Sequence, residues 1–77
     1  MHLPRYFFIG DRPVKLVATP DGGLDVLALD WDTAEFVRDL RYLSRCLHGD
    51  GEVDEVDAPE FDARVAREVA RARGSTR

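Results

Sequence analysis

The amino-acid sequence predicts an α+β domain, a three-stranded antiparallel β-meander followed by two α-helices packed on one face of the sheet. Two observations lead to this fold class. Short apolar runs separated by turn-forming residues fill the first 31 positions. Two later stretches carry apolar residues at helical spacing, and each follows an acidic residue suited to cap a helix.

Three segments have the composition of β-strands. The aromatic run RYFFI at 5–9 ends at the turn sequence GDRP at 10–13. Residues 14–19 alternate between two faces, and residues 24–31 follow the hairpin sequence PDGG at 20–23. Because short connections join antiparallel neighbours, we expect 14–19 to lie in the middle of the sheet.

The first helix is expected over 32–47. Asp32 and Glu35 have the three-residue spacing of a capping box, and Gly49 suits the left-handed conformation that ends a helix. At 100° per residue one stripe of this segment is apolar and is expected to pack on the sheet. That stripe consists of Phe36, Leu40, Leu43 and Leu47.

A second helix is expected over 58–73. Asp57 and Glu60 repeat the capping-box spacing. The apolar stripe of this helix is centred on Phe61, Val65 and Val69. Residues 53–56 are a candidate for a short extended piece, and 74–77 are expected to form a frayed tail.

The 77 residues predict a single small domain over 1–77, close to the size at which one core gives marginal stability. Alternate side chains of the strands, such as Tyr6 and Phe8, place apolar groups on both faces of the sheet. Two helices on one face leave the other uncovered. This predicts a homodimer or a bound protein partner, and the alternative is a monomer whose amino-terminal arm covers that face.

Charge and composition favour a cytoplasmic protein. The net charge is −4, with three Arg against twelve acidic residues in 20–60 and five Arg against two in 61–77. One cysteine rules out an intramolecular disulfide, and no apolar run is long enough to span a membrane. Ten of the eleven basic residues are Arg, which suggests a GC-rich bacterial genome.

No set of side chains has the pattern of a catalytic site. Cys46 and His48 are two positions apart and would point in different directions on a helix. Asp30 and Asp32 are better explained as turn-forming and capping residues than as a pair of catalytic acids. We therefore expect a protein that is not an enzyme and carries no cofactor.

The acidic segment 50–57 was compared with a calcium-binding loop. Asp50, Glu52 and Asp54 fall at the first, third and fifth ligand positions. Glu55, however, stands where a glycine is required, and Phe61 stands where the bidentate glutamate should be. The sequence therefore predicts a solvated acidic loop without a calcium site of this type, and the alternative is a divalent ion held loosely by Asp50, Glu52 and Asp54.

These observations predict a small protein-binding or regulatory module of the accessory, inhibitor or immunity type. It would act through a sheet face or the acidic loop on another protein or a second copy of itself. The alternative is a nucleic-acid-binding regulator that uses the arginines of the two helices, which the net negative charge disfavours. The candidate binding residues are Tyr6, Phe8, Asp50, Glu52, Asp54, Glu55, Arg64, Arg67 and Arg71.

Overall fold

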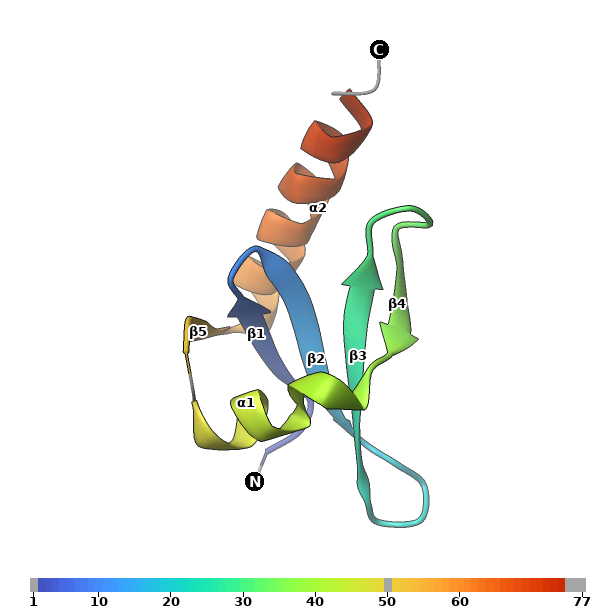
Figure 1. Ribbon diagram of the computed structural model, residues 1–77, viewed down its shortest axis with the longest axis vertical. Helices are drawn as coiled ribbons and strands as arrows, with labels where there is room; N and C mark the ends of the chain where they lie inside the picture. The colour runs from blue at the N-terminus through green and yellow to red at the C-terminus, as the bar shows by residue number, and fades with distance from the viewer. Residues whose placement is uncertain (1, 50, 75–77) are drawn as a thin grey trace.

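The computed structural model describes residues 2–49 and 51–74. Within these residues an antiparallel sheet of five strands is accompanied by one 3₁₀ segment and two α-helices (Figure 1). The elements in chain order are β1 (Arg5–Ile9), β2 (Arg12–Ala18), β3 (Leu24–Asp30), β4 (Glu35–Arg38), η1 (Leu40–Tyr42), α1 (Leu43–His48), β5 (Val53–Val56) and α2 (Ala58–Gly74).

The sheet confirms the α+β class and extends the predicted meander. The strand order is β4-β3-β2-β1-β5, so β2 occupies the middle, as predicted. β4 and β5 add one strand to each edge of the three-stranded meander. The short extended piece predicted at 53–56 is β5, which pairs with β1.

β2 begins earlier than predicted, because Arg12 and Pro13 belong to the strand instead of the preceding turn. Pro13 has no N–H to donate to the neighbouring strand, and proline is therefore rare in a central strand. The register between β2 and β3 pairs Val14 with Ala28, and one residue further along it would set Pro13 opposite Leu29. The guanidinium of Arg12 donates to the Leu29 carbonyl oxygen at 2.7 Å. This side chain supplies the donor that the proline lacks.

The predicted helix over 32–47 is wrong in its first half, residues 32–39. The Asp32 N–H donates to the Asp30 side chain, and the Ala34 N–H donates to the Asp30 carbonyl oxygen. Ala34 has a φ of 60°, which a right-handed helix does not allow. The chain turns there and returns as β4, with Phe36 paired opposite Leu29.

The helical part of this segment is confined to η1 and α1. Asp39 precedes η1 and accepts a hydrogen bond from the Arg41 N–H at 3.2 Å. Gly49 ends α1 in the left-handed conformation, with a φ of 69°, as predicted. The expected apolar stripe does not form, since Leu40 is 47% exposed and Leu47 is 40% exposed.

The two helices pack on opposite faces of the sheet, which corrects the prediction that both cover one face. Cys46 of α1 joins the core on one face, which we call the α1 face, whereas Phe61 of α2 packs on the other, the α2 face. Both faces are apolar, so each needs a cover of its own. The buried core of the α1 face consists of Phe7, Ile9, Val14, Leu16, Val26, Ala28 and Cys46.

α2 confirms the second predicted helix. The Asp57 carboxylate accepts a hydrogen bond from the Glu60 N–H at 2.9 Å, and Phe61 in the first turns is 1% exposed. The carboxyl-terminal half of α2 extends beyond the end of the sheet (Figure 1). Of the tail predicted at 74–77, only Gly74 lies within the described residues, where it ends α2.

Candidate binding surface

The α2 face is held together by an aromatic cluster around Phe61. The Phe61 ring lies 4.9 Å from Tyr6, 5.3 Å from Phe8 and 5.8 Å from Phe36, measured between ring centroids. The Lys15 ammonium lies 4.2 Å from the Phe36 ring centre, close enough for a cation–π interaction. Phe8 is fully covered by this packing, so it belongs to the core of the chain.

Arg64 closes the same cluster from α2. Its guanidinium carbon lies 3.8 Å from the Phe8 ring centre, and its Nη1 atom lies 3.2 Å from an Asp54 oxygen and 3.7 Å from a Glu60 oxygen. The structure therefore brings together four of the predicted binding residues, which are Tyr6, Phe8, Asp54 and Arg64. Their contacts attach α2 to the sheet.

The other predicted residues that the structure describes, Glu52, Glu55, Arg67 and Arg71, are not among those that contact the Phe61 cluster. Glu55 accepts two hydrogen bonds from Arg5, at 2.8 and 2.7 Å, and this guanidinium lowers the pKa of the Glu55 carboxyl. Glu52 and Arg67 are exposed, and Arg71 pairs with Glu68 on α2. Asp50 lies outside the described residues.

Neither the cysteine nor the acidic residues form a reactive centre in the described part of the chain. Cys46 is buried, and burial raises the pKa of its thiol, which disfavours the nucleophilic thiolate. Asp30 accepts from the backbone at the turn after β3. Among residues 2–49 and 51–74, no group of three or more His, Cys, Asp or Glu side chains is placed to hold a metal ion.

The surface that the sequence analysis missed is the outer edge of β4. Val37 of this edge strand is 46% exposed, and Leu40 follows three residues later with a similar exposure. The Asp39 N–H donates to the Val26 carbonyl oxygen, and hydrogen bonding alternates along an antiparallel pair. The backbone groups of Phe36 and Arg38 therefore point away from β3, toward the outside of the sheet.

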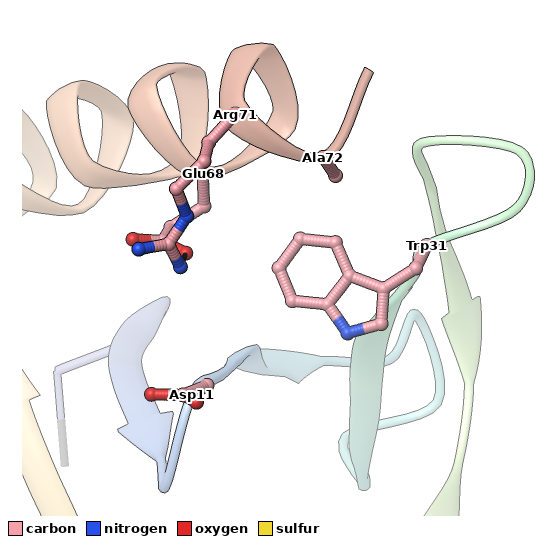
Figure 2. A pocket seen from close by; sticks show the side chains of 5 residues that line it. All are labelled: Asp11, Trp31, Glu68, Arg71 and Ala72. Atoms are coloured by element: carbon pink, nitrogen blue, oxygen red, sulfur yellow. Dashed lines mark hydrogen bonds and ion pairs between the residues drawn. The ribbon is translucent and has the colours of Figure 1, made fainter. Parts of the chain in front are cut away.

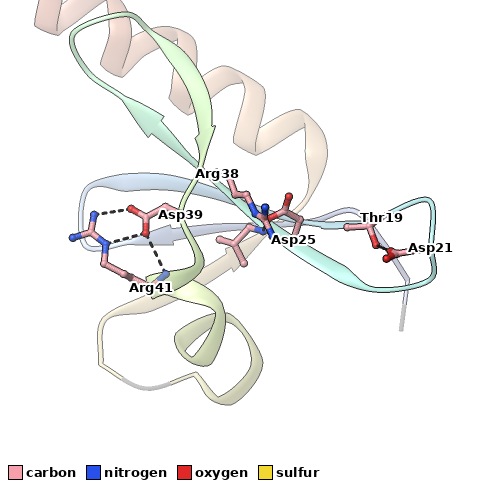
Figure 3. Close-up of polar contacts among 7 residues, drawn as sticks. Thr19, Asp21, Asp25, Arg38, Asp39 and Arg41 are labelled. Carbon is pink, nitrogen blue, oxygen red and sulfur yellow. Dashed lines mark hydrogen bonds and ion pairs between the residues drawn. The ribbon is translucent and has the colours of Figure 1, made fainter.

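A hollow of about 380 Å³ adjoins this edge on the α1 face. Trp31 and Val37 contribute its large apolar side chains, and Asp39 and Arg41 form one rim. The Arg41 guanidinium donates to the Asp39 carboxylate through Nε at 2.9 Å and Nη2 at 2.7 Å (Figure 3). This interaction lowers the pKa of the Asp39 carboxyl. The remaining lining residues are Arg12, Ala28, Asp30 and Asp32.

A second hollow, of about 460 Å³, lies between Trp31 and the projecting half of α2. Figure 2 shows the indole of Trp31 turned toward α2, with Ala72 above it and the Glu68–Arg71 pair at the other end. Asp11, in the turn between β1 and β2, completes the lining. Trp31 thus lines both hollows at the end of β3.

We call the exposed edge of β4, with Val37, Leu40 and the hollow bounded by Trp31, the β4 surface. A sequence signal for it was present in the alternation of Glu35, Phe36, Val37 and Arg38, which suits a short strand as well as a helix. The turn-forming run DWDT at 30–33 just before it also favoured a hairpin.

Comparison with known proteins gives no match for this chain. No family model matches the chain, and neither the curated proteins nor the solved structures include a significant match. Within the described residues no helix is long and apolar enough to cross a lipid bilayer.

Proposed function

We propose that this chain is a small, cytoplasmic, non-enzymatic protein-binding module, and that it docks on another protein or on a second copy of itself through the β4 surface. The observation that carries the proposal is the exposure of Val37, a β-branched apolar residue, on an edge strand whose outward backbone groups are available for pairing. Strand addition to a sheet edge uses such groups for affinity and neighbouring side chains for specificity.

Comparison with β5, the other edge strand of the sheet, supports β4 as the edge that binds a partner. β5 carries Asp54 and Glu55 in a four-residue strand, and Asp57 follows it directly. Arg5 and Arg64 pair with Glu55 and Asp54, so an approaching strand would have to lie against a row of charged side chains and reduce their hydration. Val53 and Val56 of β5 are only partly exposed, whereas β4 presents the exposed Val37, so β4 is the edge better suited to receive a partner.

The ion pairs of the arginines argue against the nucleic-acid alternative. Arg38, Arg41, Arg64 and Arg71 each lie against a carboxylate, and the chain as a whole is negative. A surface that binds phosphates gains affinity by releasing counterions from the nucleic acid. Arginines already neutralised by acidic neighbours gain less, so this alternative ranks second.

Site-specific photo-cross-linking tests the proposal. A photoreactive amino acid at Val37 is compared with the same amino acid at Leu47, which is similarly exposed but lies on α1. In cells that express the chain, we expect the photoreactive amino acid at position 37 to give a defined cross-linked product. The same amino acid at position 47 should give a weaker or different pattern. No product at position 37, or identical patterns from both positions, would contradict the proposal.

Binding of the partner identified in this way is then measured with purified proteins. Val37→Lys should weaken the complex by about tenfold or more, because it places a charge in the centre of the contact. Leu47→Lys adds the same charge to a comparably exposed position outside the β4 surface and should leave the affinity unchanged. Equal affinities of both variants would place the contact elsewhere.

A further inference from the structure

We infer that the occupant of the β4 surface is a second copy of this chain, paired antiparallel through β4 about a two-fold axis that passes beside Val37. This inference rests on the proposed function and specifies its partner. The two sheets would then join edge to edge into one continuous sheet, with the α1 faces of both copies on the same side.

Backbone geometry selects the register of this pairing. The outward backbone groups within β4 belong to Phe36 and Arg38, so these residues must form the hydrogen-bonded pairs with a partner strand. Pairing Phe36 with Arg38 of the second copy, in both directions, uses all of these groups in four hydrogen bonds. Pairing Phe36 with Phe36 would require Ala34, which turns at a φ of 60°, to continue the strand.

The same register matches the side chains. Val37 faces Val37 of the second copy in a non-hydrogen-bonded pair, where Cα atoms approach to about 4.5 Å, and the contact covers a side chain that is exposed in the single chain. On the α2 face, Arg38 lies opposite Phe36 of the other copy. The Arg38 guanidinium lies 3.0 Å from an Asp25 oxygen on β3 of its own chain (Figure 3), on the side away from the second copy, so this pair contributes through packing of the Arg38 stem and not through a cation–π contact.

One pair in this register is unfavourable by itself. Glu35 would lie opposite Asp39 of the second copy, and like charges directly opposite each other destabilise a sheet. Arg41 lies on the Asp39 carboxylate with a side chain that is 84% exposed, so a guanidinium is already present to offset the two acids.

The contact is small, and this predicts a weak dimer. A four-residue edge covers less than the roughly 800 Å² per partner that a stable interface needs, so we expect dissociation in the range of about 10 μM to 1 mM. Sedimentation equilibrium across that range should show a mass rising from one chain to two. Val37→Lys should shift the midpoint at least tenfold toward higher concentration, whereas Leu47→Lys should leave it in place.

Backbone pairing is tested separately from side-chain contact with Arg38→Pro and Arg38→Ala. Both variants lose the ion pair with Asp25, but only proline removes the outward N–H, which the ladder between β3 and β4 does not use. Arg38→Pro should therefore dimerise more weakly than Arg38→Ala. Equal association of the two, with both folded by circular dichroism, would overturn the strand pairing.

The register is tested with Val37→Cys. Opposed Cα atoms about 4.5 Å apart are within the range of a disulfide, so mild oxidation should give a covalent dimer. The parent chain, whose Cys46 is buried, and Leu47→Cys should give much less. A parent chain that remains monomeric up to 1 mM and a Val37→Cys variant that forms no dimer would overturn the self-pairing. In that case, a cross-link from position 37 to a different protein would still support the proposed function. No cross-link from position 37 would contradict both the self-pairing and the proposed function.

Discussion

The segments that follow Asp32 and Asp57 carry the same local signal and fold differently. In each, an aspartate is followed three residues later by a glutamate. The Asp57 carboxylate accepts the Glu60 N–H and begins α2. Asp32 instead lies in a turn that Asp30 organises, and Glu35 opens the strand β4.

The residues that come next account for the difference. Ala58, Pro59 and Glu60 favour a helix start, and Phe61 can then be buried against the sheet while the helix continues. Phe36 and Val37 are aromatic and β-branched residues that suit a strand. As part of β4, Phe36 reaches the same aromatic cluster from the sheet side. A capping-box spacing thus shows where a helix can begin, and the burial available to the following side chains decides whether it does.

Removing the Phe61 side chain, which attaches α2 to the sheet, should lower the stability of the chain more than any other substitution in this comparison. Phe61→Ala should lower the free energy of unfolding by about 3–5 kcal/mol, because the ring is completely buried among three aromatic residues. Phe36→Ala should cost less, since the Phe36 ring is only half-buried. Urea denaturation followed by circular dichroism measures both. If Phe61→Ala prevents folding, Phe61→Leu provides a milder variant, and a loss no greater than that of Phe36→Ala would contradict the packing.

The two aspartates should differ when each is replaced by alanine. Asp57→Ala removes a cap that satisfies a backbone N–H and should cost about 1 kcal/mol. Asp32→Ala should change stability by less than about 0.5 kcal/mol, because Asp32 is exposed and Asp30 accepts the hydrogen bond of the turn. Equal losses in urea denaturation would mean that Asp32 caps a helix after all.

The parts of the fold that were predictable depend on local chemistry. The strands at 5–9 and 24–30, the cap at Asp57 and the end of α1 at Gly49 all follow from turn residues, alternation or capping. β4 was predicted as helix because four residues, 35–38, are too few to distinguish strand alternation from helical periodicity, and the spacing of Asp32 and Glu35 favoured a helix start over the hairpin with the preceding strand β3. The prediction that both helices cover one face was wrong for the same reason, because it relied on an apolar stripe that runs through the residues of β4.

The candidate site was predicted less well than the fold. Phe8 and Arg64 were chosen because aromatic and cationic side chains often bind ligands, yet they contact each other in the attachment of α2. The sequence pattern places Val37 in a predicted helix and gives it no binding role. Whether a side chain is exposed depends on which face of the sheet each helix covers, and no single segment carries that information.

Glycine substitutions should change stability with opposite signs in the two segments. Ala34 has a positive φ, which costs an alanine roughly 1 kcal/mol that a glycine avoids. Glycine also has greater conformational entropy than alanine in the unfolded chain, which offsets part of this gain. Ala34→Gly should therefore raise the free energy of unfolding by about 0.5 kcal/mol. Ala66→Gly, at an exposed position inside α2, should lower it by about 0.5–1 kcal/mol. Thermal unfolding of the pair measures the contrast, and two losses of equal size would mean that Ala34 lies in a helix.

The ion pairs Asp39–Arg41 and Glu55–Arg5 should make the free energy of unfolding fall in acid. The Arg41 guanidinium lowers the pKa of the Asp39 carboxyl, and the Arg5 guanidinium lowers the pKa of the Glu55 carboxyl. A lowered folded-state pKa contributes stability that is fully present above the ordinary carboxyl pKa of about 4 and is lost as the pH falls through the folded value. Because solvent screens both pairs, the contribution of each to stability should be small. Urea titrations from pH 7 to pH 2.5 should show a smaller acid loss for Asp39→Asn and for Glu55→Gln than for the parent chain, and an unchanged pH dependence in both variants would show that neither pair stabilises the fold.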